Sequence, residues 1–329
     1  MKRYYWFVPI LFVLCACGGN AVAPALGVAP APHPDRRSSW ISPELERTQA
    51  PLLFVSDAGT ADVYIYNVKT LKLIGTITGF AQPQGECSDN KGNVWVTDAS
   101  GETVYELSHR GHLENELVQK GATPVGCTWD PTTGNLAVMS LLGVPSQSGG
   151  VLVFPKGVGT PTLYTNSKQY FYNFGDYDAG GNLFFDGRDA NGNFMLSELP
   201  KGKSSAHTVA LTGGTIYFPG MVQWDAAKQD FIVGDQSCGN LYASCVYSVK
   251  IAGNTASITG ETKLQNSAGG QLCDLVQGVL FNKELLGSDN DFCGSTPSAT
   301  YIWPYPGGGA PTRYNGKTDS VPVGAAISR

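Results

Sequence analysis

The stretch PQGECSDNKGNVWVTD, residues 83–98, contains the pattern that decides the fold: a short apolar strand ending near Asp, a turn with Gly, and a second apolar strand. The pattern returns with variations at residues 124–140, 173–187 and 219–235. The strands that follow the turn begin about every 40 to 55 residues, which is the range of repeat lengths found in β-propellers. The repeat therefore predicts a ring of similar β-sheets.

Each repeat divides into four strands, separated by turns rich in Gly, Asn and Asp. In the quoted repeat the strands are expected at residues 84–89, 93–97, 103–108 and 113–118. Later repeats are expected at residues 125–165, 173–211, 219–264 and 271–314.

The first repeat is incomplete, because residues 52–57, 62–67 and 72–78 supply three strands but no innermost strand. The chain ends in VPVGAAIS, residues 321–328, which has the pattern of the missing strand. We therefore expect an all-β fold, a six-bladed β-propeller of four-stranded blades, in which the C-terminal strand closes the ring by joining the N-terminal blade. Such closure removes an exposed sheet edge that would favour aggregation.

The composition agrees with an all-β protein. Charged residues make up 15% of the chain, and 41 Gly and 20 Pro interrupt its apolar runs. No segment has the periodicity of an amphipathic helix over about ten residues. The formal net charge is -5, and no basic cluster extends beyond Arg36 and Arg37. A nucleic-acid partner requires a concentrated cationic face, so the composition argues against nucleic acid as a ligand.

The N-terminus has the features of an export signal. Two basic residues follow the initiator Met, and the apolar stretch at residues 4–16 is too short for a membrane-spanning helix. Residues 14–17, Leu-Cys-Ala-Cys, are followed by two glycines and resemble the bacterial lipobox. This resemblance implies a lipoprotein signal peptide at residues 1–16 and lipidation of Cys17. The alternative is an ordinary signal peptide with an incidental Cys.

Residues 17–50 are rich in Ala, Pro, Gly and Ser, a composition typical of flexible linkers. This segment is expected to tether a β-propeller domain, residues 51–329, to the membrane through the N-terminal lipid. The expected location is therefore extracytoplasmic, at the cell envelope of a bacterium.

The repeats resemble those of NHL-type six-bladed propellers, the broad class that includes the regucalcin and gluconolactonase group and the streptogramin lyases. The resemblance spans residues 51–329 and depends on P-x-G and D-x-x-G-N elements such as Pro83, Gly85, Asp89, Gly92 and Asn93. These motifs specify a blade and not an activity, because the same architecture serves enzymes, scaffolds and ligand-binding proteins.

Six cysteines remain when the two in the export signal are set aside. An even number of cysteines outside the cytoplasm favours disulfides. Cys87 and Cys127 have opposite side-chain parity on equivalent strands of neighbouring blades, so they are expected to face each other and pair. Metal binding is less favoured, because no pair has C-x-x-C spacing and no His adjoins a Cys. Two local pairs are also expected, Cys238–Cys245 and Cys273–Cys293, with Cys238–Cys293 as the alternative.

Three carboxylates are expected on innermost strands, at Glu86, Asp176 and Asp274. Clustered oxygen ligands suit a hard divalent cation such as Ca²⁺. Resemblance to the regucalcin-like class implies a divalent metal at the central mouth, held in part by a Glu on an inner strand, and Glu86 matches that position. The acidic set of that class is incomplete here, because the equivalent residues are Cys127, Gly175 and Val222.

A second set of carboxylates ends or follows the second strands, at Asp57, Asp98, Asp186, Asp235 and Asp289. Their recurrence at equivalent positions is what a structural role requires. We therefore expect these side chains to cap turns by accepting backbone N–H groups, in preference to forming a ring of metal ligands.

No catalytic motif accompanies these residues. The four His are not part of a motif, and no G-x-S-x-G sequence marks a nucleophile. We therefore expect a binding or scaffolding module at the cell envelope, with an envelope protein or a small molecule as its partner. The alternative is a metal-dependent hydrolase, lactonase or lyase with its site at the central mouth.

Overall fold

The computed structural model describes residues 33–144, 146–239, 243–290, 298–316 and 320–329. These residues belong to one compact unit, Pro32–Arg329, and the other unit, Met1–Ala31, lies outside the described residues. The predicted signal peptide and the lipidation site Cys17 fall in that second unit, so both stay predictions. In the described part of the chain, no helix has the length and apolar character needed to cross a membrane.

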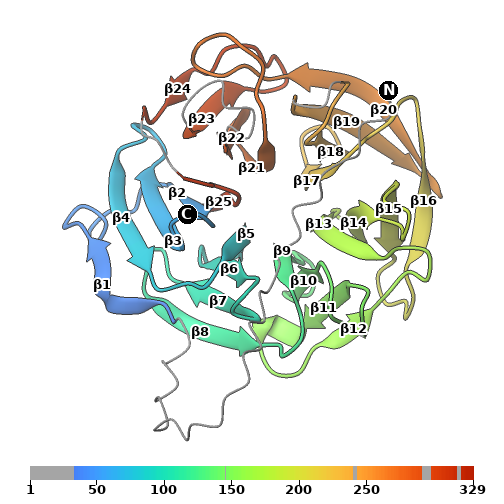
Figure 1. Ribbon diagram of the computed structural model, residues 1–329, viewed down its shortest axis with the longest axis horizontal. Coiled ribbons are helices and arrows are strands. Elements are labelled where there is room, and N and C mark those ends of the chain that lie inside the picture. Colours follow the sequence, from blue (N-terminus) through green and yellow to red (C-terminus); the bar gives the residue numbers. More distant parts are fainter. Residues whose placement is uncertain (1–32, 145, 240–242, 291–297, 317–319) are drawn as a thin grey trace, which may run out of the picture. The chain divides into compact units, whose positions relative to one another are not determined.

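The described residues form an all-β fold whose sheets surround a central axis (Figure 1). Its short helical element is the 3₁₀ turn η1 (Pro155–Gly157). Nearest the axis lie β5 (Pro83–Ser88), β9 (Pro124–Trp129), β13 (Phe171–Tyr177), β17 (Pro219–Asp225), β21 (Leu275–Phe281) and β25 (Ala326–Ser328). The second strands are β2 (Leu52–Asp57), β6 (Val94–Asp98), β10 (Leu136–Ser140), β14 (Leu183–Arg188), β18 (Asp230–Asp235) and β22 (Glu284–Asp289).

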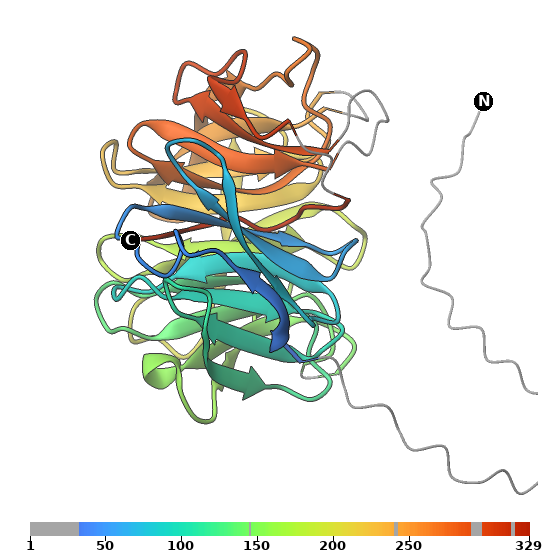
Figure 2. The ribbon, with the colours of Figure 1, turned by 90° about the vertical axis from the view of Figure 1, so that its left-hand side faces the viewer.

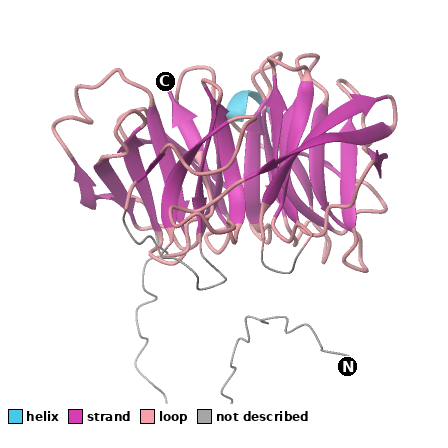
Figure 3. Ribbon diagram, turned by 90° about the horizontal axis from the view of Figure 1, so that it is seen from above, coloured by secondary structure: helices cyan, strands magenta, loops and turns pink. Residues whose placement is uncertain are grey.

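Two further strands complete each antiparallel meander. The third strands are β3 (Asp62–Asn67), β7 (Thr103–Leu107), β11 (Gly150–Phe154), β15 (Phe194–Leu199), β19 (Cys245–Ala252) and β23 (Ala299–Pro304). The outer strands are β4 (Leu73–Thr78), β8 (Leu113–Val118), β12 (Thr162–Tyr164), β16 (His207–Thr212), β20 (Thr255–Lys263) and β24 (Arg313–Tyr314). Loops collect at the two ends of the strands, as Figure 3 shows from the side of the ring.

The two ends of the described chain meet in one sheet. Strand β25 pairs with β2 in antiparallel register, with Leu53 opposite Ile327 and Phe54 opposite Ala326. Figure 2 shows this C-terminal strand running beside the N-terminal strands of the same sheet. The predicted pairing of the C-terminal strand with the first repeat is therefore confirmed.

The N-terminal boundary of the propeller differs from the one expected at residue 51. Strand β1 (Asp35–Ile41) pairs with the outer strand β4 and makes the first sheet five-stranded. Leu45, which follows this strand, is completely buried among apolar residues of the first and second sheets. Part of the expected tether thus belongs to the propeller, although its composition is that of a linker.

The hydrogen bonding also differs from six separate blades. Strands β13 to β16 and β17 to β20 form two four-stranded meanders, which join into one eight-stranded sheet. The junction is a parallel pairing of their outer strands, with Ala210 opposite Thr255 and Thr212 opposite Ser257. The other sheets are three of four strands and the five-stranded sheet described above.

The core lies between neighbouring sheets. In β6, Val94 and Val96 pack in one cluster with Phe54 of the first sheet, whereas Trp95 packs on the other side in a cluster with Leu136. The second strands are buried along almost their whole length because a neighbouring sheet covers each of their faces. This double burial explains the continuous apolar runs of the repeats.

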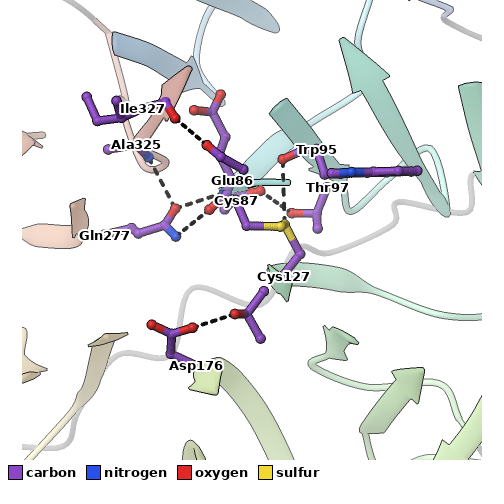
Figure 4. The surroundings of a disulfide bond; sticks show 12 residues. Glu86, Cys87, Trp95, Thr97, Cys127, Asp176, Gln277, Ala325 and Ile327 are labelled. Atoms are coloured by element: carbon purple, nitrogen blue, oxygen red, sulfur yellow. Dashed lines mark hydrogen bonds between the residues drawn. A yellow bond between two sulfur atoms is a disulfide. The ribbon is translucent and has the colours of Figure 1, made fainter. Parts of the chain in front are cut away.

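Two predicted disulfides are present. Cys87 on β5 and Cys127 on β9 are joined by an S–S bond of 2.07 Å, which links neighbouring inner strands (Figure 4). Cys238 and Cys245 are joined by a bond of 2.01 Å. Cys273 is also disulfide-bonded, but Cys293 lies outside the described residues and this pairing stays a prediction. Disulfides of this kind are typical of an oxidising compartment.

Candidate functional site

The inner strands surround a cavity of about 450 Å³ at the end of the ring where they turn back into the second strands. We call this space the central cavity. All six meanders contribute to its wall, which includes Glu86, Thr128, Asp176, Gln223, Gln277 and Ala325. Lys91 and Arg329 add two cationic side chains to the lining.

Gln277 on β21 connects three inner strands across this cavity. Its Oε1 accepts hydrogen bonds from the backbone N–H of Glu86 at 2.8 Å and of Ala325 at 3.1 Å. Its Nε2 donates to the carbonyl oxygen of Glu86 at 2.7 Å (Figure 4). Inner strands present one unpaired edge to the axis, and unpaired backbone groups are costly when they are shielded from water. The Gln277 amide supplies the partners that these edges lack.

Asp176 has a similar role on the other side of the cavity. Its carboxylate accepts hydrogen bonds from the Thr128 hydroxyl at 2.6 Å, the Trp224 N–H at 2.8 Å and the Tyr177 N–H at 2.8 Å. Burial raises the pKa of Asp176 to about 6, although the three donors favour the charged form. The side chain thus ties β9, β13 and β17 together.

Glu86 lines the same cavity but points elsewhere. It is opposite Val96 in the β5–β6 pair, on the face of the sheet that packs against β25 and the first sheet. Figure 4 shows its carboxyl group turned away from Gln277 and Asp176. The residue is 1% exposed, and neither carboxyl oxygen has a hydrogen bond of good geometry. Burial raises its pKa well above the ordinary value, and the nearby backbone of Ala326 opposes this only in part.

Asp274 precedes β21 and is not part of the cavity wall. It accepts a hydrogen bond from the Asn290 Nδ2 at 2.7 Å. Burial raises its pKa to about 6, and the charge of Asp289 adds to the effect. Of the three carboxylates predicted to hold a divalent cation, Glu86 and Asp176 therefore line the cavity and Asp274 does not. The carboxyl groups of Glu86 and Asp176 point to different neighbours.

The described residues contain one group of three potential metal ligands with their ligand atoms within 4.8 Å of one another, namely Cys238, Cys245 and Glu261. Both cysteines of this group are already in a disulfide. Metal binding there would require reduction of that bond, since the thiolate is the ligand form of Cys.

Four of the five Asp residues predicted at the ends of second strands have the expected turn-capping role. The prediction is wrong for Asp186, which lies one residue before the equivalent position, Gly187, and accepts the N–H of Phe174 within β13 at 2.9 Å. Asp98 accepts the backbone N–H groups of Ala81 and Gln82, both at 2.7 Å. Asp235 accepts those of Tyr217 and Phe218 at 2.9 and 3.0 Å. Asp57 and Asp289 bind the entering segments of their own repeats in the same way. These carboxylates hold the loop that leads into each inner strand.

Gln223 and Gln277 were not expected at the site. Gln223 accepts the Leu280 N–H at 2.6 Å and links β17 to β21. Neither Gln belongs to a recurring motif, because the equivalent positions on the other inner strands are occupied by different residues. Their positions on inner strands were the signal available in the sequence.

Comparisons with known proteins give the fold. No family model matches the sequence, and no curated protein matches it either. A solved protein of unknown function from Bacteroides caccae has a TM-score of 0.64 and 14% identity, over 85% of this chain and 100% of that chain. A chain of a nidogen–laminin complex has a TM-score of 0.65 and 12% identity, over 85% and 99%. The fold is a β-propeller. Identities this low show the fold alone.

Proposed function

We propose that this protein is an exported, lipid-anchored binding module, a β-propeller of six blades whose ligand site is the central cavity. The observation that carries the proposal is the wall of this cavity, to which every meander contributes. A volume of about 450 Å³ falls within the range of small-molecule sites, roughly 300–1,000 Å³. The side chains of Lys91 and Arg329 favour a polar ligand with negative charge.

Binding is favoured over catalysis by the state of the acidic groups. The oxygens of Asp176 accept three hydrogen bonds that tie strands together, and the side chain of Glu86 is turned away from the cavity. A general base must lie within hydrogen-bond reach of the proton that it removes. In this arrangement the Asp176 carboxylate supports the ring, which provides the rigid frame that binding loops require.

The six-blade assignment counts each meander as one blade. The pairing of β16 with β20 involves three residues of each outer strand, whereas the two inner strands, β13 and β17, are not paired to each other. The eight-stranded sheet then consists of two blades joined at the rim. The same count makes the first blade the one closed by β25.

The proposed location follows from the lipobox resemblance together with the two described disulfides. Stable disulfides persist in the periplasm and at cell surfaces but are rare in the cytoplasm. Lipid on Cys17 supplies the membrane affinity, and the cavity or the outer rim is then available to a small molecule or an envelope protein.

A second candidate function is a metal-dependent hydrolase, lactonase or lyase. It is supported by Glu86, whose two carboxyl oxygens have no hydrogen bond of good geometry. A divalent cation such as Ca²⁺ would have to draw this side chain toward the cavity. Addition of Ca²⁺ to the protein, with and without Glu86→Gln, tests this function by the shift in melting temperature.

The binding proposal is tested by a thermal-shift screen of the full-length protein against small polar anions and neutral polar molecules. A ligand of the central cavity should stabilise the wild type, because binding to the folded state alone raises its stability. The stabilisation should weaken in Lys91→Ala and persist in Lys203→Ala, whose exposed Lys lies in the turn between β15 and β16. Equal losses in both variants, or in neither, would rule out the cavity as the site.

A further inference from the structure

The end of the ring opposite the central cavity contains an arginine in an unusual setting. Arg188 is the last residue of β14 and pairs with Phe171, the first residue of β13. Its guanidinium carbon lies 4.8 Å from the centre of the Phe171 ring and 4.6 Å from that of Phe218. Phe218 comes from the loop that enters β17, so the arginine is held between two neighbouring meanders.

Contacts with two aromatic rings fix the guanidinium group without using its hydrogen-bond donors. Cation–π contacts involve the faces of the rings, whereas the five N–H groups of Arg lie in the plane of the guanidinium. Among the described residues, Arg188 has no side-chain hydrogen bond and no ion pair, and its Nε is buried without an acceptor. A buried donor without an acceptor is costly and requires an explanation.

Two polar atoms on the same pair of strands show the same deficit. Asn173 Oδ1 on β13 and Asp186 Oδ2 on β14 are buried without a hydrogen-bond partner among the described residues. Asp186 attracts the positive charge of Arg188, yet the two groups are too far apart for an ion pair. Burial raises the pKa of Asp186 well above its usual range, which favours its neutral form. The charge of Arg188 is therefore left without a close counter-charge.

The repeat does not explain Arg188. The residues at the same place in the other meanders, directly after the position that ends the second strand, are Ala58, Ala99, Leu141, Gln236 and Asn290. None of them is charged. An Arg at this position is therefore not required to build a blade, and a local departure from the pattern of a fold is typical of functional positions.

We propose that Arg188, held between Phe171 and Phe218, is the centre of a second binding site, which takes an oxyanion group of a small ligand. A carboxylate or a phosphate has the planar or forked array of oxygens that a guanidinium binds through two parallel hydrogen bonds. The two aromatic rings hold the guanidinium in place before the ligand arrives, which reduces the entropy lost on binding. This site is separate from the central cavity.

The test uses the full-length protein with sodium phosphate and sodium benzoate as probes, and sodium chloride at equal ionic strength as the reference. Phosphate and benzoate distinguish a phosphate site from a carboxylate site. Isothermal titration of the wild type should show saturable binding of at least one of them. Arg188→Gln should weaken it at least about tenfold, because a hydrogen bond to a charged group is lost.

Two control variants separate this site from other cationic positions. Arg110→Gln removes an exposed Arg from a turn between β7 and β8 and should leave the affinity unchanged. Lys203→Ala removes an exposed Lys from the turn between β15 and β16 and should also leave it unchanged. Loss of binding in Lys91→Ala with retention in Arg188→Gln would place the anion in the central cavity and overturn the proposal.

The guanidinium can also be observed directly, which keeps the test valid if Arg188→Gln fails to fold. The ¹⁵N resonance of the Arg188 Nε–H should move saturably on addition of the bound anion to the wild type. Arg188→Lys keeps the charge but not the fork of donors, so it should bind more weakly than the wild type. No saturable change of the Nε–H resonance with either probe would refute the site.

Discussion

Closure of the ring by β25 should dominate the stability of the protein. Deleting residues 322–329 removes this strand and leaves β2, all six residues of which are buried, with an open edge. The deleted segment includes Val323 at 8% and Ile327 at 5% exposure. Burying each of these side chains contributes about 1.5–3 kcal/mol. The deletion also removes the hydrogen bond from the Val323 N–H to the Ser56 carbonyl.

The expected loss is large on the scale of the whole domain. Two apolar side chains contribute about 3–6 kcal/mol together, and each lost backbone hydrogen bond adds about 1 kcal/mol. Native domains have free energies of unfolding of only about 5–15 kcal/mol. The truncated protein should therefore be marginally stable or unfolded at 25 °C, with an exposed sheet edge that promotes aggregation.

Urea unfolding followed by Trp fluorescence measures this loss. Two point variants compare a buried with an exposed side chain of the C-terminal segment. Ile327→Ala should lower the free energy of unfolding by about 2–5 kcal/mol, because it leaves a cavity in the core. Val321→Ala is the matched control, since Val321 is 40% exposed and its loss should cost less than about 0.5 kcal/mol. A truncated protein with the wild-type urea midpoint would refute the closure argument.

The remaining predictions concern single groups. The pKa of Asp176 is raised from 3.8 to about 6, so the folded state holds the proton more tightly than the unfolded state. Ionisation of this group should therefore lower the free energy of unfolding by about 3 kcal/mol as the pH rises from about 4 to 6. A ¹³C titration that gives a pKa below 4 would contradict this. Glu86→Gln should raise the free energy of urea unfolding at pH 8 by more than about 1.4 kcal/mol, because it removes a buried carboxyl group whose pKa is raised well above its ordinary value; a lower free energy of unfolding would show that the charge is compensated. Replacing Cys87 and Cys127 by Ser should cost about 2–4 kcal/mol, measured by thermal unfolding, and no loss would mean that the crosslink does not constrain the unfolded chain. Cys17→Ala should release the protein from the membrane fraction or stall its processing, and unchanged processing with unchanged membrane retention would exclude the lipid anchor.

Much of the architecture was predictable because each strand of the repeat is marked by its own local sequence pattern. Apolar runs mark strands covered on both faces, and the residues 321–328 have the pattern of an inner strand wherever they lie in the chain. The junction of β16 with β20 was not predictable, because it depends on how far two outer strands extend toward each other. Strand β1 was missed since its polar sequence, DRRSSWI, has no strand periodicity.

The candidate site was predictable only in part. Sequence parity alone places Glu86 and Cys87 on opposite faces of β5, and the structure confirms that Cys87 faces β9. That Asp176 would bind two neighbouring strands, and that Gln277 would connect three, depends on distances across the axis. Such distances are set by the closure of the ring, which no local pattern contains.

The meander of β13 to β16 departs from the others at the place where Arg188 lies. In the other meanders the side chain of the residue that ends the second strand accepts hydrogen bonds from backbone N–H groups of the loop that enters the inner strand. These acceptors are Asp57, Asp98, Ser140, Asp235 and Asp289. At this place β14 has Gly187, and a different residue secures the loop, since Gln169 donates to the carbonyl oxygens of Phe171 and Asp186. Gln169 thus holds the entering loop in place of a side chain at the end of β14, and the next residue, Arg188, has no part in holding it. A charged side chain that the fold does not use, and that two aromatic rings nevertheless hold in place, is best explained by a ligand.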